Sequence, residues 1–363
     1  MQLGALVFIL TPLLGMVYVM WHVWCILPSP IGVKILVMLA MIGAFMLLFV
    51  AIGRSLDTLP MSWATVIYEV STSWLIILLY LFLIFVVLEL GRLFHLVPKQ
   101  WLFGSWKGLL GIIMVITVLL VCGNIHYRHK VRQTLTMHSE KKLQRHYRLV
   151  MMSDLHLGYH NQRDEFHRWV DMINKENPDM ILIAGDIIDR SLRPLQEQKM
   201  WEEFRRLKAP VVACLGNHEY YAGKDGSEQF YQQAGIRLLR DSSMEWGEIA
   251  VVGRDDRTNP HRKTVRQLVE KVDKSKYIIL MDHQPYHLSL AEQAGVDFQL
   301  SGHTHYGQIW PISWITNAVY ECAYGPYQIG KTHYYVSSGL GIWGGKYRIG
   351  TRSEYVVLEI GKH

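Results

Sequence analysis

The sequence predicts a chain in two parts, an N-terminal transmembrane region of four helices followed by a domain of the α/β class. Three observations carry this prediction. Four long windows near the N-terminus contain no charged residue, short apolar runs alternate with amphipathic segments after residue 147, and five of those runs lead into Asp, Asn or His. Half of the 363 residues are hydrophobic and 19% are charged. This composition excludes a disordered, collagenous or disulfide-stapled protein.

The four charge-free windows have the length of membrane spans. They cover residues 1–33, 35–53, 70–88 and 108–127. A helix of about 20 apolar residues crosses the hydrocarbon core of a bilayer. Within residues 1–127 we therefore expect transmembrane helices near 5–27, 34–53, 68–90 and 108–125. The alternative, a signal peptide followed by buried core helices, is disfavoured because the first residues carry no basic side chain and three more windows follow.

Basic residues are concentrated directly after the fourth window. Residues 124–149 carry seven basic residues and one acid, whereas residues 150–363 carry 25 basic and 27 acidic residues. We predict a basic juxtamembrane linker at 128–146, with the lipid bilayer as its partner, and a soluble domain at 147–363. Eight basic residues flank the spans on one side and four on the other, which places this domain in the cytoplasm. Its acidic balance argues against a nucleic-acid partner.

The second part begins with the pattern of an α/β domain. The apolar runs at 148–152, 180–183, 211–214, 277–281 and 298–300 are predicted strands, and we expect helices at 162–175 and 195–207. The polar motifs after the strands contain Asp154 and His156, Asp186, Asn217 and His218, His283, and His303 and His305. Side chains that follow strands of one α/β sheet gather at one edge. Carboxylate, imidazole and amide groups together suit Mn, Fe or Zn better than Ca or a thiolate site.

In order and spacing, these motifs resemble those of calcineurin-like metallophosphoesterases. The family's D-x-H, G-D-x-x-D, G-N-H-[DE], H and G-H-x-H blocks all have counterparts between residue 147 and about residue 360. The resemblance implies a β-sandwich flanked by helices and a centre of two divalent metal ions, Mn, Fe or Zn. Carried over by motif, the ligands are Asp154, His156 and His305 for one metal, Asn217, His283 and His303 for the second, and Asp186 between them.

The resemblance also implies the chemistry of the site. Two cations about 3.5–4 Å apart can share a bridging hydroxide and clamp phosphoryl oxygens, so the implied activity is hydrolysis of a phosphodiester or pyrophosphate bond. His218 is the implied catalytic residue outside the ligand set, able to protonate the leaving oxygen. Asp189, one turn after Asp186, either orients a ligand histidine or caps a helix, and both interpretations stay open.

The segments 302–308 and 335–344 are similar to a bacterial membrane-associated branch of this family. That branch includes exported phosphodiesterases and multi-pass proteins, and more distantly the segments resemble UDP-diacylglucosamine pyrophosphohydrolases of lipid A synthesis. The resemblance implies an integral protein of the bacterial inner membrane that acts on a phosphorylated lipid or a lipid-linked nucleotide. Because no twin-arginine signal is recognisable, it gives no support for export.

Two alternatives remain open at this stage. Segment 310–327 is rich in Trp, Tyr and Ile and carries one charge, Glu321. It is either a loop that covers the core or an apolar lip that enters the bilayer beside the metal site and admits a lipid. The chain as a whole is either an enzyme or a regulatory or sensor protein whose four-helix region is the functional part. A complete ligand set favours the enzyme.

Overall fold

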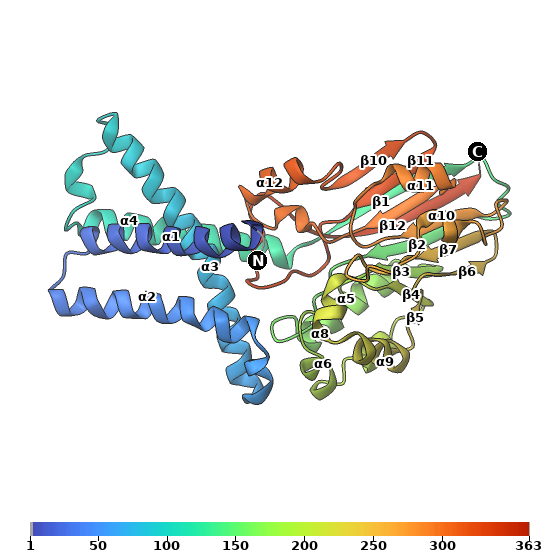
Figure 1. The fold of residues 1–363 in the computed structure, drawn as a ribbon, viewed down its shortest axis with the longest axis horizontal. Coiled ribbons are helices and arrows are strands. Elements are labelled where there is room, and N and C mark those ends of the chain that lie inside the picture. Colours follow the sequence, from blue (N-terminus) through green and yellow to red (C-terminus); the bar gives the residue numbers. More distant parts are fainter. Residues whose placement is uncertain (1–2, 363) are drawn as a thin grey trace. The chain divides into compact units, whose positions relative to one another are not determined.

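The computed structural model describes residues 3–362, with side chains from Thr11 to Gly361 except at position 54. The chain divides into two compact units, and the first comprises residues 1–124 with the short segment 344–346. Its elements, blue to cyan in Figure 1, are α1 (Leu3–Ile26), α2 (Ile31–Ile52), η1 (Arg54–Thr58), α3 (Met61–Leu93), η2 (Lys99–Trp101) and α4 (Trp106–Arg128) up to Asn124.

Three of these helices, α2, α3 and α4, are long and apolar enough to cross a membrane. They confirm three of the four predicted spans. In α1, the part with described side chains, Thr11–Ile26, is a shorter apolar helix, so the fourth span stays a prediction. With 33 residues, α3 extends for roughly 50 Å at about 1.5 Å per residue, well beyond the predicted window 68–90.

The first unit buries only a small apolar core. Met41, Phe45, Leu78 and Phe85 belong to it, each less than 10% exposed. Most of the remaining apolar surface of α2 to α4 faces outward, and only about a fifth of each span is buried. Helices that are apolar all round are typical of membrane spans.

The second unit, residues 125–343 and 347–363, contains two six-stranded mixed sheets. The first sheet has the order β1 (Lys130–Ser139), β12 (Ser353–Lys362), β2 (Tyr147–Met152), β3 (Met180–Ala184), β4 (Val211–Cys214) and β5 (Arg237–Leu238). The second has the order β10 (Gly325–Ile329), β11 (Thr332–Val336), β9 (Phe298–Ser301), β8 (Tyr277–Met281), β7 (Ile249–Gly253) and β6 (Ser242–Trp246). Strands β2, β3 and β4 are mutually parallel, as are β7, β8 and β9. Their carboxyl ends therefore meet at one edge of each sheet.

The two sheets pack face to face, and helices cover both outer faces (Figure 1). Leu149 and Met151 of β2 join a core shared with β7 and β8, whereas Val150 and Met152 point to the opposite face. This alternation follows from the two-residue period of a strand. The covering helices are α5 (Arg163–Lys175), α7 (Trp201–Phe204) and α9 (Lys224–Ala234) on the first sheet, and α10 (Val265–Val269) and α11 (Ser289–Ala294) on the second. The arrangement is a β-sandwich flanked by helices.

The stretch 128–146 differs from the predicted basic linker, because it contains the ten-residue strand β1, paired in parallel with β12. Leu135 and Met137 pack against the core between the sheets, and the residues that alternate with them, Thr134, Thr136 and His138, are exposed. The basic side chains concealed this alternation in the sequence. Arg132 pairs with Glu176 at 3.0 Å, so part of the positive charge is neutralised within the second unit.

Candidate metal centre

Five strands deliver all eight predicted site residues to one region of the second unit. Asp154 and His156 follow β2, Asp186 follows β3, Asn217 and His218 open α8 (Asn217–Ala222) after β4, His283 follows β8, and His303 and His305 follow β9. Six of the eight side chains are buried, and those of His218 and His303 are partly exposed. Buried polar side chains need hydrogen-bond partners or a bound ion, so the contacts among these eight residues indicate whether an ion fits between them.

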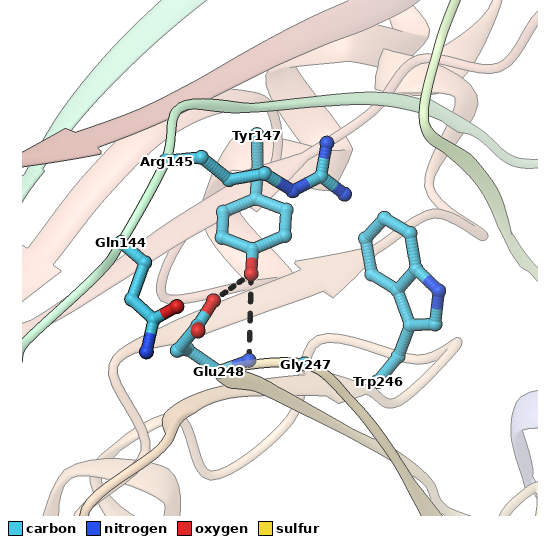
Figure 2. Close-up of a pocket in the computed structure, with 6 residues that line it drawn as sticks. All are labelled: Gln144, Arg145, Tyr147, Trp246, Gly247 and Glu248. Carbon is cyan, nitrogen blue, oxygen red and sulfur yellow. Dashed lines mark hydrogen bonds between the residues drawn. The ribbon is translucent and has the colours of Figure 1, made fainter.

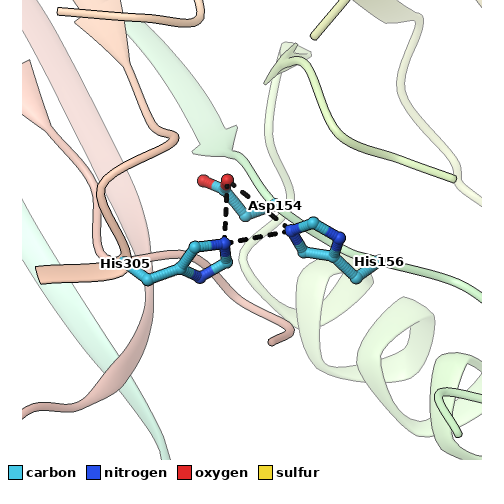
Figure 3. A group of neighbouring side chains, drawn as sticks. All are labelled: Asp154, His156 and His305. Atoms are coloured by element: carbon cyan, nitrogen blue, oxygen red, sulfur yellow. Dashed lines mark hydrogen bonds and ion pairs between the residues drawn. The ribbon is translucent and has the colours of Figure 1, made fainter. Parts of the chain in front are cut away.

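Asp154, His156 and His305 form a compact group of three side chains (Figure 3). The Nε2 atoms of His156 and His305 lie 3.0 Å apart. Oδ1 of Asp154 lies 3.8 Å from Nε2 of His156 and 3.4 Å from Nε2 of His305. Two imidazole nitrogens and a carboxylate oxygen that converge in this way match the donor set of a divalent cation such as zinc.

A second group contains Asp186, His283 and His303. Nε2 of His283 lies 3.1 Å from Oδ2 of Asp186, and the ring centroids of His283 and His303 are 5.2 Å apart. The same Asp186 oxygen lies 3.7 Å from Nε2 of His156. Asp186 therefore stands between the two groups, at the position that the family resemblance implies for a shared ligand.

The amide oxygen of Asn217 provides a direct test of whether these residues fit a cation. Oδ1 of Asn217 is buried and has no hydrogen-bond partner among the residues that the structure describes. Leaving a buried acceptor unpaired costs free energy, about 1–3 kcal/mol in protein mutational data. A cation would satisfy this oxygen, and carboxylate, imidazole and amide donors together suit Mn, Fe or Zn. The residues present therefore fit a divalent metal.

Hydrogen bonds on the far side of two histidines hold their rings in place. Nδ1 of His156 lies 3.2 Å from Oδ1 of Asp189, and Nδ1 of His283 lies 2.7 Å from the carbonyl oxygen of Ala184. Both partners accept, so each Nδ1 donates, and once the ring loses its second proton Nε2 can direct a lone pair toward the cluster. Of the two interpretations of Asp189, the geometry favours the one in which it orients a ligand histidine.

Burial and neighbouring charges set the protonation of the cluster. Burial lowers the pKa of His303 to about 4 and the pKa of His305 well below its usual value. Both rings are therefore neutral near pH 7, as metal ligands must be. Burial also opposes the charged form of His156, but the neighbouring carboxylates of Asp154, Asp189 and Asp186 outweigh it and raise the pKa of His156 to about 10. Binding of a cation at this ring would release a proton.

His218 lies beside the cluster without belonging to either ligand group. Its ring meets that of His156 edge-on with 4.5 Å between centroids, and its Nδ1 donates to the backbone carbonyl of Asp189. Its backbone N–H donates to Oδ1 of Asp186 at 3.0 Å. Burial lowers the pKa of His218 below its usual value.

The backbone adopts the left-handed region at five of the predicted ligand positions. The φ angles are +54° at Asp154, +45° at His156, +53° at Asp186, +71° at His303 and +48° at His305. This region is uncommon for residues other than glycine, and such conformations concentrate at functional sites because the surrounding structure enforces them.

Two buried residues that support the cluster were absent from the predicted set. The carboxylate of Glu219 accepts hydrogen bonds from the backbone N–H groups of Gly216 (2.7 Å), Ile188 (3.0 Å) and Asp186 (3.1 Å). It thereby joins the loops after β3 and β4. Glu219 closes the Gly-Asn-His-Glu motif, which could have revealed it. Arg348 donates a hydrogen bond to the backbone carbonyl oxygen of His305. No motif around Arg348 in the sequence indicated this contact.

A separate pocket lies at the other end of the first sheet. Figure 2 shows its six lining residues, and its volume is about 470 Å³. Tyr147, the first residue of β2, and Trp246, the last residue of β6, hold the guanidinium of Arg145 at 4.4 and 5.2 Å from their ring centroids. No predicted ligand lines this pocket, so it is distinct from the candidate metal centre.

Comparison with known proteins agrees with the geometry. The family model described as calcineurin-like phosphoesterase matches residues 147–307. Among solved structures, the 5′-nucleotidase precursor from Thermus thermophilus aligns over 55% of this chain and 49% of its own, with 16% identity and a TM-score of 0.38. We draw no conclusion about function from a similarity this low.

Two relatives show how far the similarity extends. A Campylobacter jejuni protein, named an uncharacterized metallophosphoesterase, is 30% identical over 256 residues, which cover 68% of each chain. A Danio rerio protein, named a transmembrane protein with metallophosphoesterase domain, is 27% identical over 348 residues, 88% of this chain and 78% of its own. With the site geometry and the family match, these similarities show that the chain belongs to the calcineurin-like metallophosphoesterases, a family of phosphoesterase-type hydrolases.

Proposed function

We propose that this protein is a membrane-anchored hydrolase that uses two divalent cations, Mn, Fe or Zn, to cleave a phosphodiester or pyrophosphate bond. The observation that carries the proposal is the pair of ligand groups that meet at Asp186, one around Asp154 and one around His283. A shared carboxylate between two sets of imidazoles suits a two-metal site. The anchor is supported by the three apolar helices of spanning length.

Each residue has a defined part in this proposal. One cation would be held by Asp154, His156 and His305, the second by Asn217, His283 and His303, and both by Asp186. The cations supply Lewis acidity and lower the pKa of water to near neutrality. His218 is not assigned as a ligand of either cation. Because its Nδ1 donates to the carbonyl of Asp189, its Nε2 can carry a second proton and deliver it to the leaving oxygen.

The Asp186→Ala variant tests the site. In the purified full chain in detergent, we expect loss of bound metal, measured by mass spectrometry, and loss of manganese-dependent hydrolysis of bis-p-nitrophenyl phosphate. The Asp225→Ala variant is the matched control, because the Asp225 side chain is 86% exposed and belongs to no ligand group. Hydrolysis that survives in Asp186→Ala would refute the proposed centre.

We further propose that the substrate is a phosphorylated lipid or a lipid-linked nucleotide. The support comes from α12 (Ile312–Val319), which lies shortly after the turn that carries His305. Trp314, Ile315 and Val319 are 65%, 59% and 57% exposed, and residues 307–320 carry no charge. A helix with an exposed apolar face is typical of an interfacial element. This exposure supports the lip interpretation of segment 310–327 over a loop that covers the core.

A double substitution, Trp310→Gln with Trp314→Gln, tests the lipid proposal. We expect turnover of a phosphorylated lipid in mixed micelles to fall about tenfold, because the apolar face no longer enters the micelle. Turnover of the soluble bis-p-nitrophenyl phosphate serves as the internal comparison, and Trp246→Gln, in β6, is the matched control. An equal effect on both substrates would contradict the lipid proposal.

The proposed orientation places the catalytic domain in the cytoplasm, as the distribution of basic residues favours. Protease added to intact spheroplasts should then leave the domain uncut, whereas the same protease should digest it after lysis. Digestion in intact spheroplasts would place the domain on the opposite side.

A further inference from the structure

The loop that follows β7, residues 254–263, lies against the candidate metal centre. Asp282, the residue before His283, pairs with Arg254 and with Arg262, in each case at 2.9 Å. Within the loop, the carboxylate of Asp256 accepts two hydrogen bonds from Gln284, at 2.9 and 3.1 Å. These contacts fix the loop to the residues on either side of a predicted metal ligand.

One arginine of this loop differs from the other two. The guanidiniums of Arg254 and Arg262 share the carboxylate of Asp282 as their ion-pair partner. Arg257 is exposed, and in the part of the chain with described side chains no carboxylate lies within ion-pair distance of it. Its guanidinium carbon lies 3.8 Å from the ring centroid of Tyr286. The stacking orients a positive charge that has no ion-pair partner among the described side chains.

Two tyrosines connect Arg257 with the metal centre. The hydroxyl groups of Tyr286 and Tyr320 are 3.1 Å apart, and their ring centroids are 4.9 Å apart. The ring of Tyr320 lies 6.3 Å from that of His303. We call Arg257, Tyr286 and Tyr320 the tyrosine shelf. It extends from beside His303, a predicted metal ligand, to the guanidinium of Arg257.

We propose that the tyrosine shelf binds a second phosphoryl group of the substrate, next to the phosphoryl group that is cleaved. Stacking on Tyr286 leaves the N–H groups at the edge of the guanidinium free for phosphate oxygens, which they bind in bidentate fashion. The hydrogen bond between the two hydroxyls uses one of their two protons, so the other can also be donated to an anion. This inference rests on the proposed function and names its substrate class, a pyrophosphate or a doubly phosphorylated molecule.

The Arg257→Gln variant tests the shelf through competitive inhibition. Hydrolysis of bis-p-nitrophenyl phosphate is measured in excess manganese with ADP or AMP as the inhibitor. The quantity compared between variants is the ratio of the ADP inhibition constant to the AMP inhibition constant. We expect ADP to inhibit the wild type more strongly than AMP. In Arg257→Gln the inhibition constant of ADP should rise about tenfold relative to that of AMP, because a charge-assisted contact is lost. A second arm replaces the nucleotides with phosphatidylinositol 4-phosphate and phosphatidylinositol in mixed micelles, which distinguishes a lipid from a soluble source.

Two further variants sharpen the test. Arg266→Gln is the matched control, because Arg266 is exposed on α10 and pairs with Glu270 at 3.5 Å. It should leave the ratio of inhibition constants unchanged. Tyr320→Phe removes the hydroxyl whose proton is not used between the two tyrosines, and it should raise the inhibition constant of ADP relative to that of AMP about threefold.

The outcomes separate the two proposals. A wild type that does not hydrolyse bis-p-nitrophenyl phosphate contradicts the proposed function. A wild type that hydrolyses it, but whose ratio of inhibition constants equals that of Arg257→Gln in both arms, overturns the tyrosine shelf alone. The shelf is also overturned if Arg266→Gln changes the ratio as much as Arg257→Gln does.

Discussion

The guanidinium of Arg348 donates a hydrogen bond of 2.8 Å to the backbone carbonyl of His305. The same buried side chain donates to the carbonyls of Ser338 (2.5 Å) and Gly341 (3.0 Å). The N–H of Gly341 in turn donates to the carbonyl of Asp154 at 3.0 Å. Burial lowers the pKa of Arg348 to about 10, so the group is charged at neutral pH. One cation thus holds together two segments that carry predicted metal ligands.

Replacing Arg348 should weaken both the fold and the metal centre. Arg348→Met leaves several buried carbonyl groups without a donor, and each such loss costs about 1–3 kcal/mol. We expect the melting temperature of the full chain in detergent to fall and manganese to stabilise the variant less than it stabilises the wild type. Thermal melts with and without manganese measure both effects.

Arg352→Met provides the control for this prediction. Arg352 is exposed on the segment that follows Arg348, and its guanidinium lies 5.9 Å from the ring centroid of Tyr324. Its loss should change melting little. If Arg348→Met melts and responds to manganese as the wild type does, the organising role of Arg348 is refuted.

Gly302 should be intolerant of any side chain. A Cβ at this position would lie 2.3 Å from Oδ2 of Asp154 and 2.6 Å from Oγ of Ser153. In Gly302→Ala the carboxylate must therefore move, and we expect metal binding to weaken about 10–100-fold, as for other residues that position ligands. Titration with manganese measures this. Gly111→Ala, where an added Cβ meets nothing within 4 Å, should bind metal as the wild type does.

The predicted strands and the motif residues that follow them could be derived from the sequence because their signals are local, whereas the division of those residues into two ligand groups came from the family resemblance. Each of the five predicted strands coincides with an observed one, from β2 to β9, and each polar motif directly follows its strand. The helix predicted at 195–207 is instead broken into α6 (Arg193–Glu197) and α7, and Lys199 between them has a φ of +50°. The periodicity of the apolar residues does not reveal such a break.

Other features depend on contacts that only the fold creates. Arg348 finds its partner His305 43 residues away in sequence, and no motif marks either the arginine or the carbonyl. Strand β1 is stabilised by β12, more than 200 residues later, so its basic residues suggested a linker instead. No motif marks Arg257 in the sequence, and its significance rests on Tyr286, which lies beside it, and on Tyr320, which lies beside Tyr286.

The proposed role of His218 predicts a dependence on the leaving group. If His218 protonates the leaving oxygen, His218→Asn should reduce the turnover of a diester with an alkyl leaving group about 100–10,000-fold. The loss should be smaller for p-nitrophenolate, which leaves readily without a proton. Comparison of kcat for the two diesters measures this difference.

His167→Asn is the matched control for His218→Asn. The His167 side chain is 48% exposed and contacts Glu203 at 3.0 Å, away from both ligand groups. It should leave both turnover rates unchanged. Equal losses for both leaving groups in His218→Asn would show that the residue does not act as the acid.

The Asp255 carboxylate links stability to pH. It is buried and accepts hydrogen bonds from Arg240 (2.8 Å), Tyr220 (2.7 Å) and Asn259 (2.8 Å). Burial raises its pKa, but the hydrogen bonds from these partners outweigh burial and leave the pKa of Asp255 below its usual value. The folded state therefore binds a proton at Asp255 less readily than the unfolded state does.

The lowered pKa of Asp255 in the folded state predicts that the protein loses stability in acid. The contribution of Asp255 is fully present above the unfolded pKa, about 3.9, and is lost as the pH falls toward the lower pKa of the folded state. Asp255→Asn cannot titrate, so it should melt below the wild type at pH 7, and the difference between their melting temperatures should shrink as the pH falls from about 5 to 3. Thermal melts of both proteins across this range measure the difference. A difference that stays constant with pH would show that ionised Asp255 does not stabilise the fold.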